Sequence, residues 1–390
     1  MNILMLGTTF PRRRGDGVGR FVFELARALA RSNRVEVLTT RAPGASREEV
    51  LDGVRVRRFD YVRPARFQRL TYPGGLPDQL KTSWLARLQV PFFLGTYVVQ
   101  CARRMRTADI VVCNWIYTGA IMQAAMRLSR VKRACIVIVR GSDMRLVEKG
   151  GFLSRVFLRT LRRADAVCVV ARDFVDVLRG YGVARVHFTP NGIRSAAFEL
   201  DRAAARRRLK VGDRPMVLFV GSLIDRKDAA TLVRAMRGLD AVLAIVGDGP
   251  CRPQLEQLAR DLEVETRFAG AVPAGEVPLW MAAATVFVLP SLYEGRANAL
   301  IEAMAAGRAC IATRIKGSRE LIVDGESGFL VPVQSPDALQ QGIRRLLDDP
   351  ELRKRFEAAA VERVRTLVPT WEQSAARYLD IAGKVARGGA

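Results

Sequence analysis

Histidine is almost absent from the 390-residue sequence, which contains only His187. A catalytic mechanism that needs two histidines is therefore excluded. The six cysteines are scattered and form neither a C-x-x-C motif nor a Cys/His cluster. This pattern predicts no zinc site and no disulfide framework, and it is typical of buried thiols in a reducing cytoplasm. The cysteines are Cys101, Cys113, Cys135, Cys168, Cys251 and Cys310.

Long apolar runs are also missing. No stretch approaches the roughly 20 uninterrupted apolar residues that a membrane-spanning helix needs. The nearest run, residues 88–102, is broken by Gln89, Pro91, Gly95 and Gln100. The first residues have no basic region and too short an apolar run for a signal peptide. We therefore expect a cytoplasmic protein without transmembrane helices.

Acidic residues are few relative to basic ones. Lys and Arg number 63 and Asp and Glu 39, which gives a formal net charge of +24, and 55 of the 63 are Arg. Residues 1–190 contain 34 basic and 14 acidic residues, whereas residues 191–390 contain 29 and 25. An Arg-rich proteome explains the preference for Arg but not this asymmetry. The basic half is typical of a protein that meets an anionic partner: nucleic acid, an anionic membrane or a phosphorylated substrate.

Short apolar runs alternate with helix-period stretches along the whole chain. This alternation predicts parallel sheets with helices on both faces, in an α/β fold. Turn chemistry at residues 189–193 and the charged segment at 201–208 place a domain boundary at roughly 190–213. The predicted strands are 2–7, 34–39, 110–113, 134–139, 166–169, 186–189, 215–220, 243–246, 266–269, 286–289 and 309–312, and the predicted helices include 19–31, 229–236, 254–262 and 299–306.

Two glycine-containing motifs follow predicted strands. In the turn at residues 15–19, Gly17 and Gly19 precede a helix, so backbone N–H groups are placed to face an anion. The turn is not GxGxxG, and the chain has no P-loop motif. The second motif, residues 221–227, combines a glycine at a strand end with the adjacent cations Arg226 and Lys227. That combination suits a diphosphate.

Residues 290–307 form the strongest motif, in which Glu294 and Glu302 are separated by seven residues. Asn298 is an expected N-cap, which leaves the N–H groups of the first helical turn free to bind a phosphate. Carboxylates accept hydrogen bonds from hydroxyl groups, so the pair suits a polyhydroxylated ligand. We expect Glu302 to bind a ribose and Glu294 a sugar ring.

This Glu-x7-Glu element resembles the signature of retaining glycosyltransferases of the GT-B fold, in the large "group 1" family of bacterial mannosyl-, glucosyl- and N-acetylglucosaminyltransferases. The resemblance extends over nearly the whole chain. Residues 15–19 resemble the family's N-terminal glycine loop, 190–192 its Pro-Asn-Gly turn, 221–227 its phosphate-binding strand end, 317–320 its GG-x-x-E element and 328–331 its G-x-L-V strand. Residues 371–372 resemble the start of its last helix, which crosses back onto the N-terminal domain.

The resemblance implies two Rossmann-like domains that face each other across a cleft. We place the acceptor domain at 1–195, completed by a helix at 371–388, and the nucleotide-sugar-binding domain at 196–370. No metal or other cofactor is implied. The implied catalytic residues are Glu294, Arg140 and Lys227, and the acceptor-side residues are Asn114, Trp115 and Asp143. The implied donor-binding residues are Gly17, Gly19, Gly221, Ser222, Arg226, Lys227, Glu294, Asn298, Ala299, Leu300 and Glu302.

Several positions depart from the family pattern. Ser222 stands where an Arg is common, and Arg226 is expected to compensate. The family often reads H-x-H-W where residues 112–115 read Val-Cys-Asn-Trp, and HGSD where Arg140 opens Arg-Gly-Ser-Asp. An Arg side chain stays protonated, so Arg140 suits stabilisation of leaving-group charge and not general-base catalysis. We expect His187 to be structural.

The implied activity is metal-independent transfer of a hexose, with retention, from a nucleoside diphosphate sugar to an acceptor. The basic half favours a lipid-linked or glycan acceptor of cell-surface polysaccharide synthesis, and docking on the anionic inner face of the membrane. A long core helix over 84–106 is the alternative explanation of that region. Its cations are Arg66, Arg69, Lys81, Arg87, Arg103, Arg104 and Arg106, which flank Trp84, Phe92 and Phe93.

Three other functions fit parts of the sequence. A nucleotide-sugar 2-epimerase shares the GT-B fold and needs no acceptor. A pseudo-enzyme would bind the donor without turnover, because the family histidine is replaced. A nucleic-acid-binding protein agrees with the charge, but no nucleic-acid motif is present and the paired glutamates would repel phosphates.

Overall fold

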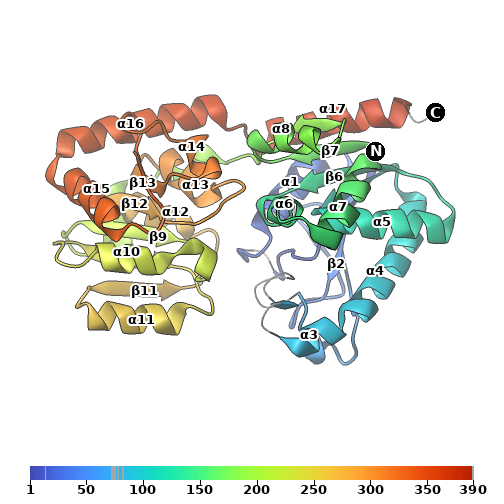
Figure 1. Cartoon of the computed structure of the whole chain (residues 1–390), viewed down its shortest axis with the longest axis horizontal. Coiled ribbons are helices and arrows are strands. Elements are labelled where there is room, and N and C mark those ends of the chain that lie inside the picture. The colour runs from blue at the N-terminus through green and yellow to red at the C-terminus, as the bar shows by residue number, and fades with distance from the viewer. Residues whose placement is uncertain (14, 72–75, 77–78, 81–82, 389–390) are drawn as a thin grey trace. The chain divides into compact units, whose positions relative to one another are not determined.

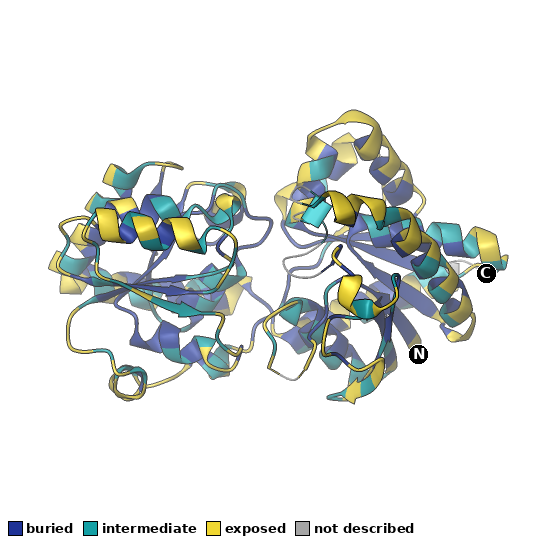
Figure 2. Cartoon of the chain, turned by 90° about the horizontal axis from the view of Figure 1, so that it is seen from below, coloured by how far each residue is buried: buried dark blue, intermediate teal, exposed yellow. Residues whose placement is uncertain are grey.

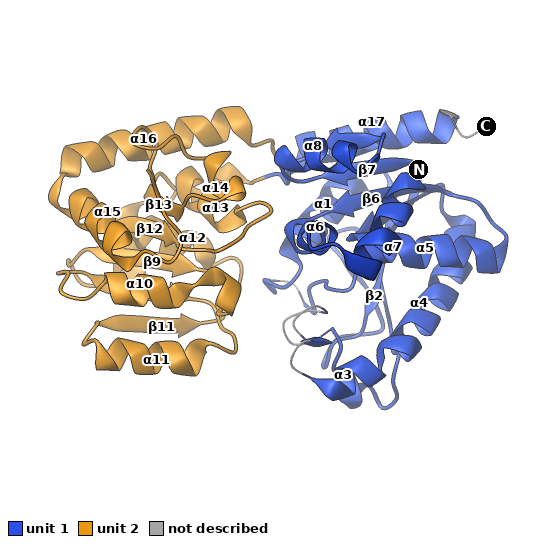
Figure 3. Ribbon diagram, in the orientation of Figure 1, with its two compact units in different colours: residues 1–192, 371–390 blue, residues 193–370 orange. Residues whose placement is uncertain are grey.

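The computed structural model describes residues 1–13, 15–71, 76, 79–80 and 83–388 (Figure 1). The chain forms two compact units, one of residues 1–192 with 371–390 and one of residues 193–370 (Figure 3). The expected boundary after residue 195 is therefore too late in the chain. Ile193 is already buried in the second unit, where its N–H donates to the Pro369 carbonyl at 2.9 Å.

The first unit contains an eight-stranded sheet in the order β3-β4-β2-β1-β5-β6-β7-β8. All neighbouring strands are parallel except β3 and β4, which form an antiparallel hairpin that the sequence analysis did not predict. The central strands are apolar because helices cover both faces of the sheet. The strands are β1 (Asn2–Leu6), β2 (Arg34–Thr40), β3 (Glu48–Leu51), β4 (Val54–Phe59), β5 (Ile110–Asn114), β6 (Ala134–Val139), β7 (Ala166–Val169) and β8 (Val186–Phe188).

The last helix of the chain belongs to the first unit, as the family resemblance implied. It packs against α1, where Arg31 and Glu372 form an ion pair at 2.8 Å. Trp371 and Tyr378 are buried in the core of that unit. The helices of this unit are α1 (Arg20–Ala30), α3 (Trp84–Leu88), α4 (Val90–Arg104), α5 (Ile116–Ser129), α6 (Gly141–Glu148), α7 (Gly151–Arg162), α8 (Asp173–Gly180) and α17 (Trp371–Gly388).

The segment at 84–106 is not one long core helix. Pro91 lies in the first turn of α4, and the helical run is divided at Gln89 between α3 and α4. Phe93 is buried, but Trp84 is 68% and Phe92 65% exposed. The apolar residues of this segment therefore lie on two sides, one in the core and one at the surface. Lys81, part of the predicted basic cluster, lies outside the described residues.

The second unit contains a six-stranded, fully parallel sheet in the order β11-β10-β9-β12-β13-β14. Its strands are β9 (Met216–Val220), β10 (Val242–Val246), β11 (Thr266–Gly270), β12 (Val286–Leu289), β13 (Ala309–Thr313) and β14 (Phe329–Val331). Its helices are α9 (Arg202–Leu209), α10 (Ala229–Ala235), α11 (Arg252–Asp261), α12 (Val277–Ala283), α13 (Asn298–Ala305), α14 (Lys316–Arg319), α15 (Pro336–Asp348) and α16 (Pro350–Leu367).

Burial follows the layers of each unit: the inner strands are buried, the edge strands β3 and β11 are not, and the outer sides of helices are exposed (Figure 2). Within the described parts of the chain, no helix is both long and apolar enough to cross a bilayer. All six cysteines are free thiols, and five are buried. Cys251 is only half-buried, contrary to the expectation that all would be buried, because it lies in the turn before α11 and not in a strand.

Candidate active site

Each sheet reverses its winding direction between two central strands. In the second unit the reversal lies between β9 and β12, and in the first between β1 and β5. Ligand sites of open α/β sheets lie at the carboxyl ends of the strands at such a point. Residues 221–227 follow β9 and residues 290–298 follow β12, so the topology brings these two motifs together. Residues 7–19 and 114–115 meet in the same way in the first unit.

Glu294 is held at this edge of the second unit by three side chains. Its Oε1 accepts hydrogen bonds from Ser291 Oγ at 2.8 Å and from Lys227 Nζ at 2.5 Å. Arg226 Nη1 lies 3.4 Å from Oε2. Because Glu294 is only 6% exposed, these contacts replace water around the carboxylate. The two cations exceed the one carboxylate by a single positive charge, which favours an anionic ligand.

Close backbone contacts fix the loop that carries Lys227. A Cβ atom on Gly247 would lie 1.9 Å from the Gly221 carbonyl oxygen, and one on Gly249 would lie 2.3 Å from that of Leu223. Only glycine fits at these two positions of the loop after β10. The loop after β12 is hydrogen-bonded to the loop that carries Lys227, since Leu292 N–H donates to the Arg226 carbonyl at 2.9 Å. The three loops therefore position Lys227 and Glu294 together.

The start of α13 differs from the prediction in one respect. Asn298 is not the N-cap: the helix begins at Asn298, and Ala297 occupies the N-cap with φ −81° and ψ 72°. The turn closes early because Asn298 N–H donates to the Arg296 carbonyl at 3.0 Å. No side-chain hydrogen bond caps the helix, and Ala299 and Leu300 lie in its first turn.

Other predicted donor-site residues lie around this edge. Glu302 follows in the second turn of α13 and is half-buried. Gly221 is half-buried and Ser222 is exposed at the end of β9. The structure thus brings the second-unit candidates to the carboxyl ends of β9 and β12.

Arg140 lies at the carboxyl end of β6 in the first unit and is 6% exposed. Its Nη2 donates to Asn114 Oδ1 at 2.8 Å, and its Nη1 donates to Asn191 Oδ1 at 3.2 Å. The guanidinium carbon lies 4.2 Å from the centre of the Phe21 ring. Burial lowers the pKa of Arg140 to about 10, so the side chain is still a cation at neutral pH. Both oxygens that accept hydrogen bonds from its guanidinium belong to neutral amides.

Asp143 joins two helix starts in the same region. Its carboxylate accepts hydrogen bonds from Arg140 N at 2.8 Å and from Ile116 N at 3.0 Å, at the beginnings of α6 and α5. Burial raises the pKa of Asp143 to about 7, against the opposing effect of these N–H groups. Trp115 has a φ of 72°, an uncommon value for a non-glycine residue, and its ring stacks on Tyr117 with centroids 6.0 Å apart.

The predicted glycine loop lies between β1 and α1. Gly19 has a φ of 69°, and a Cβ atom there would lie 2.7 Å from the Thr9 carbonyl oxygen, so this position requires glycine. Gly17 lies in open space. Thr8 Oγ1 and the Tyr117 hydroxyl are 2.6 Å apart, which connects this loop to α5. The first-unit candidates therefore also share one edge of their sheet.

Asn191, Ser291 and Phe21 contact the predicted residues but were not predicted themselves. Asn191 lies in the Pro-Asn-Gly turn and Ser291 follows β12 closely, so strand-end position was the signal that could have identified both. His187 lies on β8 with its side chain exposed, and its partial desolvation, followed by the nearby positive charge of Lys384, lowers its pKa.

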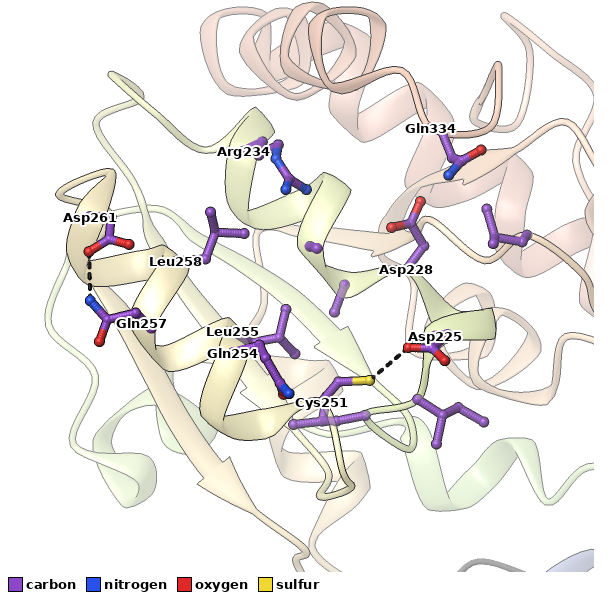
Figure 4. A pocket seen from close by; sticks show the side chains of 15 residues that line it. Asp225, Asp228, Arg234, Cys251, Gln254, Leu255, Gln257, Leu258, Asp261 and Gln334 are labelled. Atoms are coloured by element: carbon purple, nitrogen blue, oxygen red, sulfur yellow. Dashed lines mark hydrogen bonds between the residues drawn. The ribbon is translucent and has the colours of Figure 1, made fainter. Parts of the chain in front are cut away.

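A cavity of about 710 Å³ lies between α10 and α11 of the second unit (Figure 4). Leu223, Asp225 and Leu292 are among its lining residues, but Glu294, Lys227 and Glu302 are not. Cys251 Sγ lies 3.3 Å from Asp225 Oδ1, and burial, followed by this contact, raises the thiol pKa to about 11. Over the residues that the structure describes, no cluster of His, Cys, Asp and Glu has the composition of a metal site.

Two family profiles match the chain, one in each unit. Residues 16–192 match "Glycosyl transferase 4-like domain" and residues 201–363 match "Glycosyl transferases group 1". The fold is similar to that of sucrose-phosphate synthase from Thermosynechococcus elongatus, with a TM-score of 0.82 and 23% identity over 99% of both chains. At that identity the likeness concerns the fold, which is the predicted GT-B arrangement of two Rossmann-like domains.

Curated relatives are more similar in sequence. A D-inositol 3-phosphate glycosyltransferase of Nocardioides sp. is 31% identical, over 94% of this chain and 84% of the relative. A GDP-mannose-dependent alpha-(1-6)-phosphatidylinositol monomannoside mannosyltransferase of Mycobacterium tuberculosis is 29% identical, over 97% of both. An alpha-D-kanosaminyltransferase of Streptomyces kanamyceticus is 34% identical over 50% of this chain and 54% of the relative. For that relative and one other, the match spans only about half of the relative's length.

Proposed function

The chain belongs to the group 1 family of glycosyl transferases, and on this premise we propose that it transfers a sugar from a nucleoside diphosphate sugar to an acceptor hydroxyl, with retention at the anomeric carbon. The observation that supports this proposal best is the arrangement of Glu294. Its carboxylate is held by Lys227, Arg226 and Ser291 at the point where the second sheet reverses direction.

The donor binds the second unit in this proposal. Lys227 and Arg226 neutralise the diphosphate, and the uncapped first turn of α13 adds N–H donors. Glu302 binds the ribose hydroxyls and Glu294 the sugar hydroxyls. These groups supply the charge neutralisation that a metal ion provides in other transferases, so we propose metal-independent transfer.

In the chemical step the acceptor oxygen forms a bond to the anomeric carbon while the bond from that carbon to the diphosphate oxygen breaks. Attack on the same side as the departing group accounts for retention. The acceptor proton passes to the leaving diphosphate oxygen, so no protein base is required. Arg140, a cation held by Asn114 and Asn191, stabilises the negative charge that develops on the leaving group.

We propose a lipid-linked or glycan acceptor of cell-surface polysaccharide or glycolipid synthesis. Relatives are named for phosphatidylinositol mannoside and inositol phosphate acceptors. We also propose a cytoplasmic protein that docks peripherally on the anionic inner face of the membrane through the α3–α4 patch, which we define as Trp84, Leu85, Leu88 and Phe92 with the exposed cations Arg66, Arg69 and Arg87. Exposed apolar side chains among cations are typical of membrane surface contacts.

The test is a thermal-shift screen of UDP-, GDP- and ADP-sugars followed by a transfer assay with the donor that stabilises the chain. We expect one nucleotide class to raise the melting temperature and Glu294→Ala to abolish sugar release. A chain that no sugar nucleotide stabilises would contradict the proposal. Product analysis with the donor alone separates transfer from 2-epimerisation, since only an epimerase converts the donor sugar without an acceptor.

A further inference from the structure

Exposed apolar side chains are concentrated in the first unit. Among the described residues, 15 of the 18 exposed large hydrophobic side chains belong to it, including all five that are aromatic. The same unit contains 37 basic and 16 acidic residues, against 26 and 23 in the second. Contiguous apolar surface on a soluble domain usually marks an interaction site. Its combination with this charge excess points to an anionic partner.

Helix α7 carries a second exposed apolar cluster, which the sequence analysis did not identify. Phe152 is 76%, Leu153 46% and Val156 36% exposed at the start of the helix. The helix follows two glycines with positive φ, Gly150 at 76° and Gly151 at 86°, in a turn that projects Phe152 outward. We define the α7 tip as residues 149–159.

Cations surround this cluster. Lys149, Arg155 and Arg159 are exposed within the α7 tip. Helix α7 contains no acidic residue. Apolar residues that lead a helix, followed by arginines, are the composition of a segment that inserts at the boundary between lipid headgroups and acyl chains.

The α7 tip and the α3–α4 patch lie at the same edge of the first sheet. Helix α7 leads into the parallel strand β7 and α4 into β5, so both helices begin at the carboxyl edge of the strands. Helix α5 packs against both α4 and α7, which places the three helices side by side. Packed helices have axes 8–10 Å apart, so the axes of α4 and α7 are at most about 20 Å apart. Arg140 and Asn114 end strands at this same edge.

We infer that the α7 tip is a second lipid contact, so that the first unit docks on an anionic bilayer at two points with the carboxyl edge of its sheet turned toward the headgroups. This inference rests on the proposed peripheral membrane docking and specifies its orientation. A second copy of the chain is disfavoured as the occupant, because two units with this charge excess repel each other. Lipid is favoured over nucleic acid because the side chains of Leu153 and Val156 can form neither hydrogen bonds nor ion pairs with a phosphate backbone.

Tryptophan fluorescence tests the contact directly. Trp84 is exposed, whereas Trp115, Trp280 and Trp371 are 9%, 3% and 7% exposed. In a W84F/F152W double variant of the full chain, position 152 is therefore the one exposed tryptophan among these sites. We expect a blue shift and quenching by brominated lipid when vesicles containing phosphatidylglycerol are added, and neither with phosphatidylcholine alone. Unchanged emission from position 152 while the chain is vesicle-bound would overturn the inference.

Flotation with the same vesicles gives the matched comparison. We expect F152S/L153S to lower the bound fraction at limiting lipid by about 10-fold or more, because two large apolar groups no longer leave water. The control is L128S, which changes a side chain that is 60% exposed at the opposite end of α5 and should leave binding unchanged.

Three results would contradict the inference. F152S/L153S and L128S could lower vesicle binding equally, the chain could bind duplex DNA more tightly than vesicles, or it could self-associate through the α7 tip. Donor-dependent thermal stabilisation is measured on the same samples. It does not involve the α7 tip, so its loss would signal failure of the proposed glycosyl transfer and not of the lipid contact.

Discussion

Replacing Arg140 with lysine separates the charge of this buried side chain from its shape. The guanidinium reaches two acceptors at once, with Nη2 on Asn114 at 2.8 Å and Nη1 on Asn191 at 3.2 Å. A lysine ammonium is a single nitrogen and reaches only one of them. Arg140→Lys therefore keeps the cation but leaves one buried amide oxygen without its donor.

The expected cost follows from that lost bond. A hydrogen bond to a charged group contributes about 1.5–3 kcal/mol, and the face-on contact with the Phe21 ring is also weakened. For a unit of this size, each kcal/mol corresponds to a change of about 2–4 °C in melting temperature. We expect Arg140→Lys to lower the calorimetric transition of the first unit by about 3–12 °C, and to reduce kcat/KM for sugar transfer because the cation is no longer fixed.

Arg127→Lys is the matched control. Arg127 is exposed in the last turn of α5, and the same substitution there should change stability by less than about 0.5 kcal/mol. Equal melting temperature and turnover in Arg140→Lys and Arg127→Lys would show that the two-acceptor geometry is not what holds Arg140.

Three further predictions concern the same two edges. Glu294→Gln should lower the free energy of unfolding by about 2–3 kcal/mol. Adding Lys227→Met should lower it little further, because both substitutions break the same ion pair, and additive losses in calorimetry would contradict this. Burial raises the pKa of Asp143 from 3.8 to about 7, so the folded state binds this proton more tightly than the unfolded state. The first unit should therefore lose up to about 1.4 kcal/mol of stability per pH unit as pH rises from about 4 to about 7. Asp143→Asn should flatten this dependence of stability on pH. Gly247→Ala should weaken donor-induced thermal stabilisation because its Cβ would overlap the Gly221 carbonyl, whereas Gly212→Ala, with open space around it, should not.

The regular parts of the fold could be predicted from the sequence, because buried parallel strands are continuous apolar runs that need little context. The β3–β4 hairpin was missed because its strands are rich in Glu and Arg. Its turn did carry a signal: Asp52 and Gly53 have φ values of 47° and 84°, and Asp-Gly is a preferred pair for a two-residue hairpin turn.

The candidate site was predictable as a set of strand ends but not as a set of contacts. Motif spacing located Glu294 and Lys227, yet nothing in it showed that Ser291 would share the carboxylate. The cap at Asn298 was predicted wrongly because residue type favours that position, while the local turn placed the residue inside the helix. Asn191 was identified as part of a turn, and only the folded sheet brings it to Arg140.

The return of α17 to the first unit has a consequence for synthesis on the ribosome. Ser374 Oγ donates to the Pro190 carbonyl at 2.5 Å, and Trp371, Tyr378 and Ile381 bury apolar surface in the core of that unit. These residues are translated after all of residues 193–370. Part of the core of the first unit therefore stays exposed until the second unit has been translated. We expect chaperones to bind this exposed apolar surface during that interval.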